Sequence, residues 1–316
     1  MLALFLAFAV CKETCVEADT CTGENYYWEG VAADGYTLKL VPNSTGGVPS
    51  VQSVLMIIQM QGGMIDNNNT QNYGSNNNSA NGYTEVGGAG LYEFAVVVSV
   101  AQNTGTCEVK LDRSLTNTYD NLRNNRFQAI GFSFCSSVVV NNPQVPDWNG
   151  YTGGVFVMLA EVINLGKVNM VGKGFRGGPG FGTKYFTFFD DPGNYRDDSA
   201  TTFGNDQRFN GPKGEGFIGY PNYPTIPNGR GNTTYPEGFD SGKGAPGNAG
   251  GGGSWTDSGG GGGGNAGRGG DGNKNTIHAL AFYAEQPGFG GAPVPLTATS
   301  RLFLGKVIHS KDVVLT

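Results

Sequence analysis

Hydrophobic residues in the first half of the chain form short runs that predict β-strands. Residues 36–41 alternate apolar and polar side chains, which is typical of a strand with one buried face. Residues 53–60 are apolar almost without interruption, which indicates a strand buried on both faces. Residues 91–100 are rich in β-branched and aromatic side chains, and a turn at 102–105 leads to 107–111. These last two runs therefore form a predicted hairpin.

Further apolar runs follow at close spacing. Residues 127–140 predict one or two strands, and shorter pieces at 155–159, 162–165 and 168–171 are separated by glycine or asparagine. Such short pieces are typical of tight hairpins or of the rungs of a β-solenoid. The predicted fold class is therefore all-β, with a β-sandwich or short β-solenoid in the N-terminal region and a glycine-rich, loop-dominated C-terminal half.

Asparagine and glycine interrupt this strand pattern. Residues 64–82 are dominated by asparagine, which favours turns, so they predict a long exposed loop. Residues 275–285 fit a helix or a strand equally well, and 301–304 with 307–308 predict two final strand segments.

Composition changes abruptly after residue 172, where glycine, proline and asparagine become dominant. Glycine supplies 54 of the 316 residues, and the hydrophobic fraction is only 38%. The predicted organisation has five parts: a signal peptide (1–9), a cysteine-containing N-terminal segment (10–35), a β domain (36–171), a glycine-rich region (172–291) and a C-terminal strand segment (292–316).

The densest glycine tract spans residues 241–273. Glycine loses the most backbone entropy on ordering and offers no side chain to pack. Two outcomes are open for such a tract: a flexible solvated coil, or extended chains that stack and hydrogen-bond backbone to backbone because no Cβ keeps them apart. Either outcome suits a structural or display element better than a catalytic pocket.

Charge and the N-terminus bear on location and partners. The net charge is −6, with no basic cluster, so nucleic acid is not an expected partner. Residues 2–10 are apolar and contain Ala7-Phe8-Ala9, which fits the cleavage rule of a signal peptide and is too short to span a bilayer. We therefore expect a secreted protein, found outside the cell or at its surface, with no transmembrane segment. The alternative is a buried N-terminal strand.

Cysteines and glycosylation sequons fit an exported protein. Cys11 is the odd member of five cysteines, and the other four are disulfide candidates with open connectivity: Cys15, Cys21, Cys107 and Cys135. Candidate N-glycosylation acceptors stand at Asn43, Asn68, Asn77 and Asn232.

Motifs for catalysis or cofactor binding are not supported. Residues 172–177 match the glycine pattern of dinucleotide sites, but Gly178-Pro179-Gly180 follows where a helix is needed. The only histidines are His278 and His309, and no nucleophile elbow is present. We predict no catalytic and no cofactor-binding residue, and hence no enzyme; a glycosidase using paired carboxylates is a minor alternative.

Two weaker kinds of site remain. Calcium is the one candidate cofactor, because carboxylates in loops are its preferred ligands, with a solvated acidic loop as the alternative. The calcium candidates are Asp190, Asp191, Asp197, Asp198 and Asp271. Three aromatic residues, Trp148, Tyr151 and Trp255, are surface-contact candidates that could stack on glycans, or they could pack against the glycine-rich loops.

An ordered series of landmarks resembles a known type of module. The series runs from 148–155 through 174–178 and Gly214-Glu215-Gly216 to the glycine runs at 244–253 and 259–267, and it ends at 301–305. This pattern resembles a glycine-rich module of large secreted bacterial surface proteins, notably Bacteroidota proteins exported by type IX secretion. Similar glycine-rich proteins also occur in eukaryotic extracellular matrices. The resemblance implies a surface or matrix protein and assigns no catalytic residue.

The expected function is that of a secreted structural or adhesive protein that acts by display and self-association. Its expected partners are further copies of itself or other matrix and surface components. A carbohydrate-binding adhesin, at a cell surface or a phage-fibre tip, is the alternative, and a secreted hydrolase is a weaker one.

Overall fold

The computed structural model describes the β domain almost completely and the glycine-rich region in pieces. The described residues are 18–21, 23–43, 47–66, 73–75, 81–122, 125–178, 213–219, 242–253, 259–265, 267–273, 287–294 and 301–303. Within these ranges the regular elements are all β-strands, eleven in number, which confirms the predicted all-β class.

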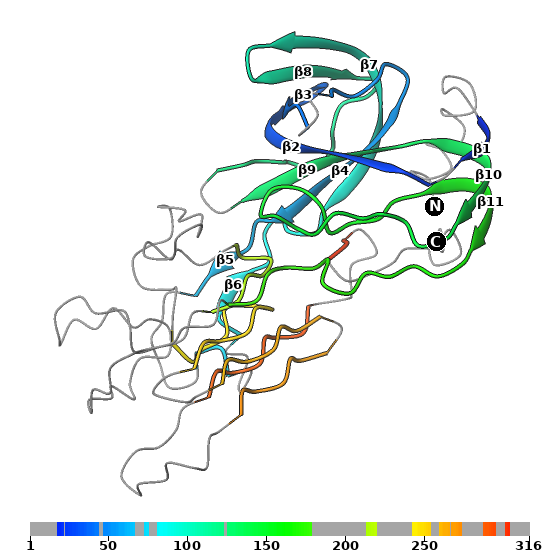
Figure 1. The fold of residues 1–316 in the computed structure, drawn as a ribbon. Coiled ribbons are helices and arrows are strands. Elements are labelled where there is room, and N and C mark those ends of the chain that lie inside the picture. Colours follow the sequence, from blue (N-terminus) through cyan, green and yellow to red (C-terminus); the bar gives the residue numbers. More distant parts are fainter. Residues whose placement is uncertain are drawn as a thin grey trace, which may run out of the picture.

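Six strands close into a barrel rather than forming the expected sandwich or solenoid (Figure 1). In order around the barrel they are β2 (Asn25–Asp34), β3 (Thr37–Val41), β8 (Thr106–Leu111), β7 (Tyr92–Asn103), β4 (Val54–Gln61) and β9 (Arg126–Phe132). Every neighbouring pair is antiparallel, and β9 pairs with β2 to complete the circle. Closure leaves the barrel no free strand edge.

The hydrophobic pattern explains which faces lie inside. β3 and β8 alternate buried with more exposed positions, so one face of each lines the barrel. Every residue of β4 is buried, as the continuous apolar run predicts. Leu55 and Ile57 belong to the core inside the barrel, whereas Met56 and Ile58 pack outside it with Trp148. The second layer on β4 therefore comes from the segment that follows β10.

A parallel sheet lies beside the barrel. β10 (Phe134–Val140) pairs with β1 (Ala18–Cys21) on one side and with β11 (Leu159–Leu165) on the other. β9 and β10 are separated by Ser133 alone, so the barrel continues directly into this sheet. Of the short apolar pieces predicted after residue 150, only the region of β11 forms a strand.

The asparagine-rich segment is not simply an exposed loop, although only parts of it are described. β5 (Met64–Ile65) and β6 (Tyr83–Glu85) form a two-stranded sheet at its ends. Residues 73–75 are buried, and Tyr73 is only 1% exposed. The prediction for 64–82 is therefore wrong in these parts, because this segment packs against the glycine-rich region.

The predicted boundaries also shift. β2 belongs to the barrel although its residues were assigned to the N-terminal segment 10–35. Near the other end of the chain, Arg301 forms an antiparallel bridge with Leu91, and Leu302 donates its amide to the carbonyl of Gly90 at 2.7 Å. Residues 301–303 therefore return to the barrel.

Candidate functional site

The glycine-rich region forms a bundle of extended segments bonded to one another through their backbones. Four segments make up this glycine bundle: segment I (242–253), segment II (259–265), segment III (267–273) and segment IV (287–294). They run beside one another in Figure 1, coloured from yellow to orange-red. Of the two outcomes open for the glycine tract, the described residues adopt backbone pairing.

Hydrogen bonds from segment II recur at every third residue. Gly259 and Gly262 donate their amides to carbonyls of segment III, at 3.1 and 2.8 Å. Gly261 and Gly264 donate to segment I, both at 2.8 Å. Segment II is therefore bonded to two neighbours through two interleaved sets of amides.

Hydrogen bonds from segment IV also recur at every third residue, and they join this segment to both segment II and segment I. Gly288, Gly291 and Val294 donate to segment II at 2.9, 2.9 and 2.7 Å. Phe289 and Ala292 donate to segment I, both at 2.7 Å. A β-strand has a period of two and partners in one plane, whereas three residues per turn is the period of the polyproline II helix. The bundle therefore has the threefold periodicity of polyproline II chains, cross-linked by their amides.

Close approach of the main chains requires the absence of side chains. A Cβ at Gly261 would overlap the carbonyl oxygen of Phe289, and a Cβ at Gly272 would overlap that of Gly259. On the outer side the situation differs, because a Cβ at Gly267 or Gly270 would meet no atom within 4 Å. The inner glycines are thus needed for packing, while the outer ones leave a face without side chains.

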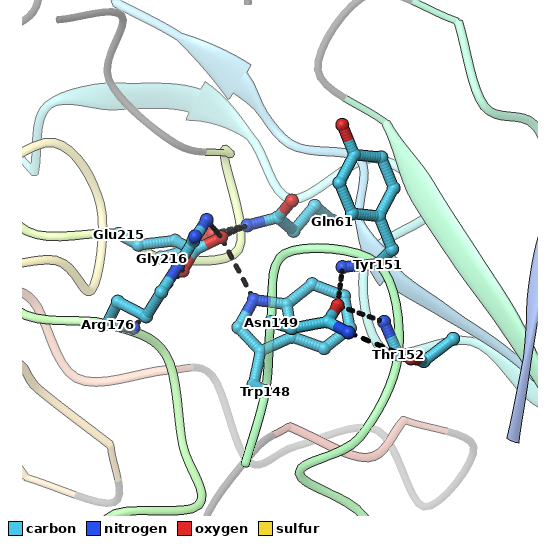
Figure 2. Close-up of polar contacts among 8 residues, drawn as sticks. All are labelled: Gln61, Trp148, Asn149, Tyr151, Thr152, Arg176, Glu215 and Gly216. Carbon is cyan, nitrogen blue, oxygen red and sulfur yellow. Dashed lines mark hydrogen bonds and ion pairs between the residues drawn. The ribbon is translucent and has the colours of Figure 1, made fainter. Parts of the chain in front are cut away.

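A buried carboxylate connects this region to the barrel. Glu215 lies between two glycines, and its side chain is 0% exposed. Its neighbours come from separate parts of the chain: Gln61 from the end of β4, Trp148 from the segment after β10, and Arg176 from a loop. Figure 2 shows these side chains converging on Glu215, and together we call them the Glu215 cluster.

Each of the three partner side chains in the Glu215 cluster donates a hydrogen bond to the carboxylate. Oε1 accepts from Nε2 of Gln61 and from Nε1 of Trp148, both at 2.9 Å. Oε2 accepts from Nε of Arg176 at 2.8 Å and from its backbone amide at 3.1 Å. The guanidinium also gives the buried charge its counter-ion. Because charge and hydrogen bonds are both satisfied, the cluster is suited to positioning segments rather than to chemistry.

An apolar contact reinforces the attachment. Phe217 and Ile218, two and three residues after Glu215, pack in one buried cluster with Ala89, Val294 and Phe303. The amides of residues 62 and 63 both donate to the carbonyl of Phe217, at 2.9 and 3.2 Å. Segment 213–219 is therefore held to the barrel on one side and to segment IV on the other.

The described part of the asparagine-rich segment covers segment I. Ala245 is fully buried, and a Cβ at Gly74 or at Gly82 would overlap its backbone. The amide of Gly247 donates to the carbonyl of Asn81 at 3.0 Å. This contact is the physical reason why residues 73–75 are buried.

The aromatic candidates have different outcomes. Trp148 is 2% exposed and donates to Glu215, so its assignment as a surface contact is wrong, and it packs edge-on against Phe175 instead. Tyr151 is half-buried, and the guanidinium of Arg126 lies 5.4 Å from the centre of its ring. Trp255 lies outside the described residues.

A short loop orients Tyr151. The side-chain oxygen of Asn149 accepts from the amides of Tyr151 and Thr152, at 2.9 and 3.0 Å. In Figure 2 the dashed line from Tyr151 leads to Asn149 and not to Glu215. Tyr151 is thus the one accessible member of the three aromatic candidates among the described residues.

Among the calcium candidates, only Asp271 is described. Its carboxylate pairs with the guanidinium of Arg268 and accepts from the amide of Gly290 at 2.7 Å. Within the described ranges, acidic, histidine and cysteine residues form no group of three or more that could hold a metal ion. The other calcium candidates lie outside the described residues: Asp190, Asp191, Asp197 and Asp198.

One disulfide candidate is corrected. Cys107 is a free thiol buried in the barrel core, and burial raises its pKa. It is therefore not bridged. Cys135 lies in β10 and is paired in register with Ala18 of β1, the strand that ends at Cys21. A bridge from Cys135 to the N-terminal segment remains a prediction, and Cys15 lies outside the described residues.

The other surface predictions are only partly described. Asn43 lies just after β3, and its side-chain oxygen accepts from the amide of Gly47 at 2.8 Å. The remaining sequons, at Asn68, Asn77 and Asn232, lie outside the described residues, as does the predicted signal peptide. Among the residues that the structure describes, no helix has the length and apolar character needed to cross a membrane.

The residues that our site prediction missed are polar groups within apolar or glycine-rich surroundings. Glu215 and Arg176 were predicted only as landmarks of the resemblance, and no role was predicted for Gln128. Gln128 is fully buried in β9, where it accepts from the amide of Gly153 and donates to its carbonyl, both at 2.9 Å. An isolated charge between glycines is the one signal that could have found Glu215.

The chain was also compared with known proteins. It matches no model of a known protein family and no curated protein sequence.

Proposed function

We propose that this protein is a secreted structural or adhesive protein, which acts by displaying the glycine bundle and by associating with further copies of itself. The observation that carries this proposal is the cross-linking of segments I to IV through backbone hydrogen bonds at every third residue. Order of this kind turns a glycine tract into a rigid element whose surface is main chain.

The attachment to the barrel supports a display role. The Glu215 cluster and the packing of Phe217 fix the bundle to a closed barrel at two adjacent points. A buried carboxylate that is paired with a guanidinium favours one relative arrangement over others, because displaced arrangements leave the carboxylate unpaired. The barrel then serves as a base, and the bundle as the displayed part.

Two measurements test this proposal. Hydrogen exchange should show protected amides in segments II and IV, since bonded amides exchange only after opening. Sedimentation velocity at increasing protein concentration should show association without added ligand. Fast exchange throughout the bundle together with a monomer at every concentration would overturn the proposal.

A carbohydrate-binding adhesin is the second candidate, supported by the accessible ring of Tyr151 beside Arg126. Aromatic faces that remain accessible are suited to stacking on sugar rings. A glycan array with the wild-type protein and with Tyr151→Ala tests this candidate. Tyr26, which is 51% exposed on β2, offers the matched control Tyr26→Ala. Binding that is lost in the first variant and retained in the second would favour the adhesin.

A further inference from the structure

Segments II and III form the exposed outer layer of the glycine bundle. Some of their backbone amides donate no hydrogen bond to any described residue. In segment II, one set of amides points to segment I and another to segment III, as described above. The remaining set is Gly260 and Gly263, and both residues are exposed. Within the described part of the chain, neither amide donates a hydrogen bond.

Segment III repeats this situation. Gly269 and Gly272 donate to segment IV, at 2.9 and 2.8 Å. Gly270 is exposed, its amide donates no hydrogen bond among the described residues, and a Cβ there would meet no atom within 4 Å. Gly267 is likewise exposed with open space at its Cβ position. Among the described residues, the outer layer therefore has amides that donate no hydrogen bond, and in segment II they recur at the threefold period by which the inner segments are joined.

Such a face selects its partner by shape. Amides repeating every third residue along a polyproline II chain are spaced about 9 Å apart. Inside the bundle, this spacing is matched by extended segments that carry no side chain at the contact. A partner for the outer layer must match this spacing and carry no side chain where it meets the open glycine positions Gly267 and Gly270. The glycine-rich segments of this chain itself meet both conditions, so the occupant is a second copy.

Charge on segment III also fits a second copy. Arg268 and Asp271 are both exposed and stand one threefold turn apart. In an antiparallel arrangement about a two-fold axis between these two positions, Arg268 of one copy faces the partner's Asp271, and the reverse holds at the same contact. The face is therefore self-complementary in charge as well as in backbone pattern.

We propose that the outer layer formed by segments II and III is the surface through which two copies of this chain associate, edge to edge, extending the glycine bundle across the interface. This inference rests on the proposed function and identifies the surface that would carry it. The backbone bonds to segments I and IV are retained, and the internal pair of Arg268 with Asp271 is exchanged for pairs between the two copies.

The experiment is sedimentation velocity of the full chain over a range of concentrations. The double variant Gly267→Lys/Gly270→Lys adds two long charged side chains where open space exists. The control Gly177→Lys places the same residue at an exposed glycine elsewhere, also with no atom within 4 Å of its Cβ. We expect at least about tenfold weaker association for the double variant and wild-type association for the control. Unchanged melting temperatures of both variants establish that each one folds.

A charge swap separates contacts between copies from contacts within one copy. Arg268→Asp makes the outer face doubly negative, and Asp271→Arg makes it doubly positive. Each variant alone should associate weakly, because like charges meet across the two-fold axis, whereas an equimolar mixture should associate again. An internal ion pair cannot be restored by mixing two proteins.

The outcomes distinguish the two proposals. Wild-type association of Gly267→Lys/Gly270→Lys would overturn this inference and leave self-association through another surface standing. Absence of association in the wild-type protein at every concentration would overturn this inference and the self-association in the proposed function together.

Discussion

The indole nitrogen of Trp148 lies 2.9 Å from a carboxylate oxygen of Glu215, although 67 residues separate them along the chain. Trp148 also packs against β4 of the barrel through Met56 and Ile58, and Glu215 leads directly into the packing of Phe217. This one hydrogen bond therefore joins the barrel layer to the glycine-rich region. Glu215, a glutamate between two glycines, therefore has a structural role in holding these two parts of the protein together.

Removing the carboxylate should destabilise the whole protein. Glu215→Ala leaves the indole N–H of Trp148 buried without an acceptor, takes one of two acceptors from Nε2 of Gln61, and removes the carboxylate that pairs with Arg176. We expect a loss of about 3–5 kcal/mol in the free energy of unfolding, measured by urea denaturation.

The matched control for this substitution is Lys173→Ala. Lys173 pairs with Asp147, whose side chain is 74% exposed, so the loss should stay below about 1 kcal/mol. Similar losses for the two variants would contradict the structural role of the Glu215 cluster.

Alanine should have opposite effects at two glycines of the bundle. At Gly261 the added methyl group overlaps the carbonyl oxygen of Phe289, so we expect a loss of about 2–3 kcal/mol. At Gly270 the methyl group enters open space, and the backbone φ is not in the left-handed region. There we expect a gain of about 0.4–1 kcal/mol from reduced entropy of the unfolded chain. Thermal unfolding of both variants tests this; equal effects would indicate an unpacked bundle.

Cys107 and Cys135 should react differently with a thiol reagent. Cys107 is fully buried, and its raised pKa keeps it in the thiol form, so iodoacetamide should label it only after unfolding, without any reductant. Cys135 is predicted to be bridged to the N-terminal segment, so it should be labelled only after reduction. Peptide mass spectrometry reads out both sites. Labelling of Cys107 in the folded protein would contradict its place in the barrel core.

Stability should fall in alkaline solution. Burial raises the pKa of Tyr27, whose hydroxyl donates to the carbonyl of Val155 at 2.7 Å, and burial is also the main cause of the raised pKa of Tyr119. An unfolded tyrosine ionises near pH 10. Above that pH the folded state holds more protons than the unfolded state, so the free energy of unfolding decreases as pH rises.

The measurement is urea unfolding at a series of pH values from neutral to alkaline. Tyr27→Phe should lessen the decline above about pH 10, because phenylalanine cannot ionise there. Tyr36→Phe serves as the control at an exposed position next to the same strand. An identical decline in Tyr27→Phe and in the wild-type protein would show that the burial of Tyr27 does not govern it.

Much of the barrel could be predicted from local pattern. The alternation in β3 and the continuous apolar run of β4 indicate which residues are buried from the sequence of one strand alone. The hairpin of β7 with β8 follows from two runs that are adjacent in the sequence. Closure could not be predicted in this way, because it depends on the pairing of β2 with β9, whose register is set by strands far apart in the sequence. For the same reason, β2 was placed outside the β domain.

The glycine bundle was predictable only as an alternative. Glycine content admits both a coil and paired chains, since local preference is nearly the same for each. Paired chains form only where neighbouring segments are held close enough to accept the amides. The buried cluster of Phe217, Ile218 and Val294 holds the segments together in this way. Trp148 illustrates the same limit, because its position as an accessible or a buried aromatic depends on Glu215.

From sequence alone, this protein was determined to be all-β in its first half and glycine-rich in its second half, because apolar periodicity and glycine content are local properties. Tertiary structure decided that the strands close into a barrel, that Glu215 is paired and buried, and that glycine amides join neighbouring segments at every third residue. These features depend on contacts between residues that are distant in the sequence. Such contacts are set by the packing of the whole chain rather than by the local preferences of any one segment.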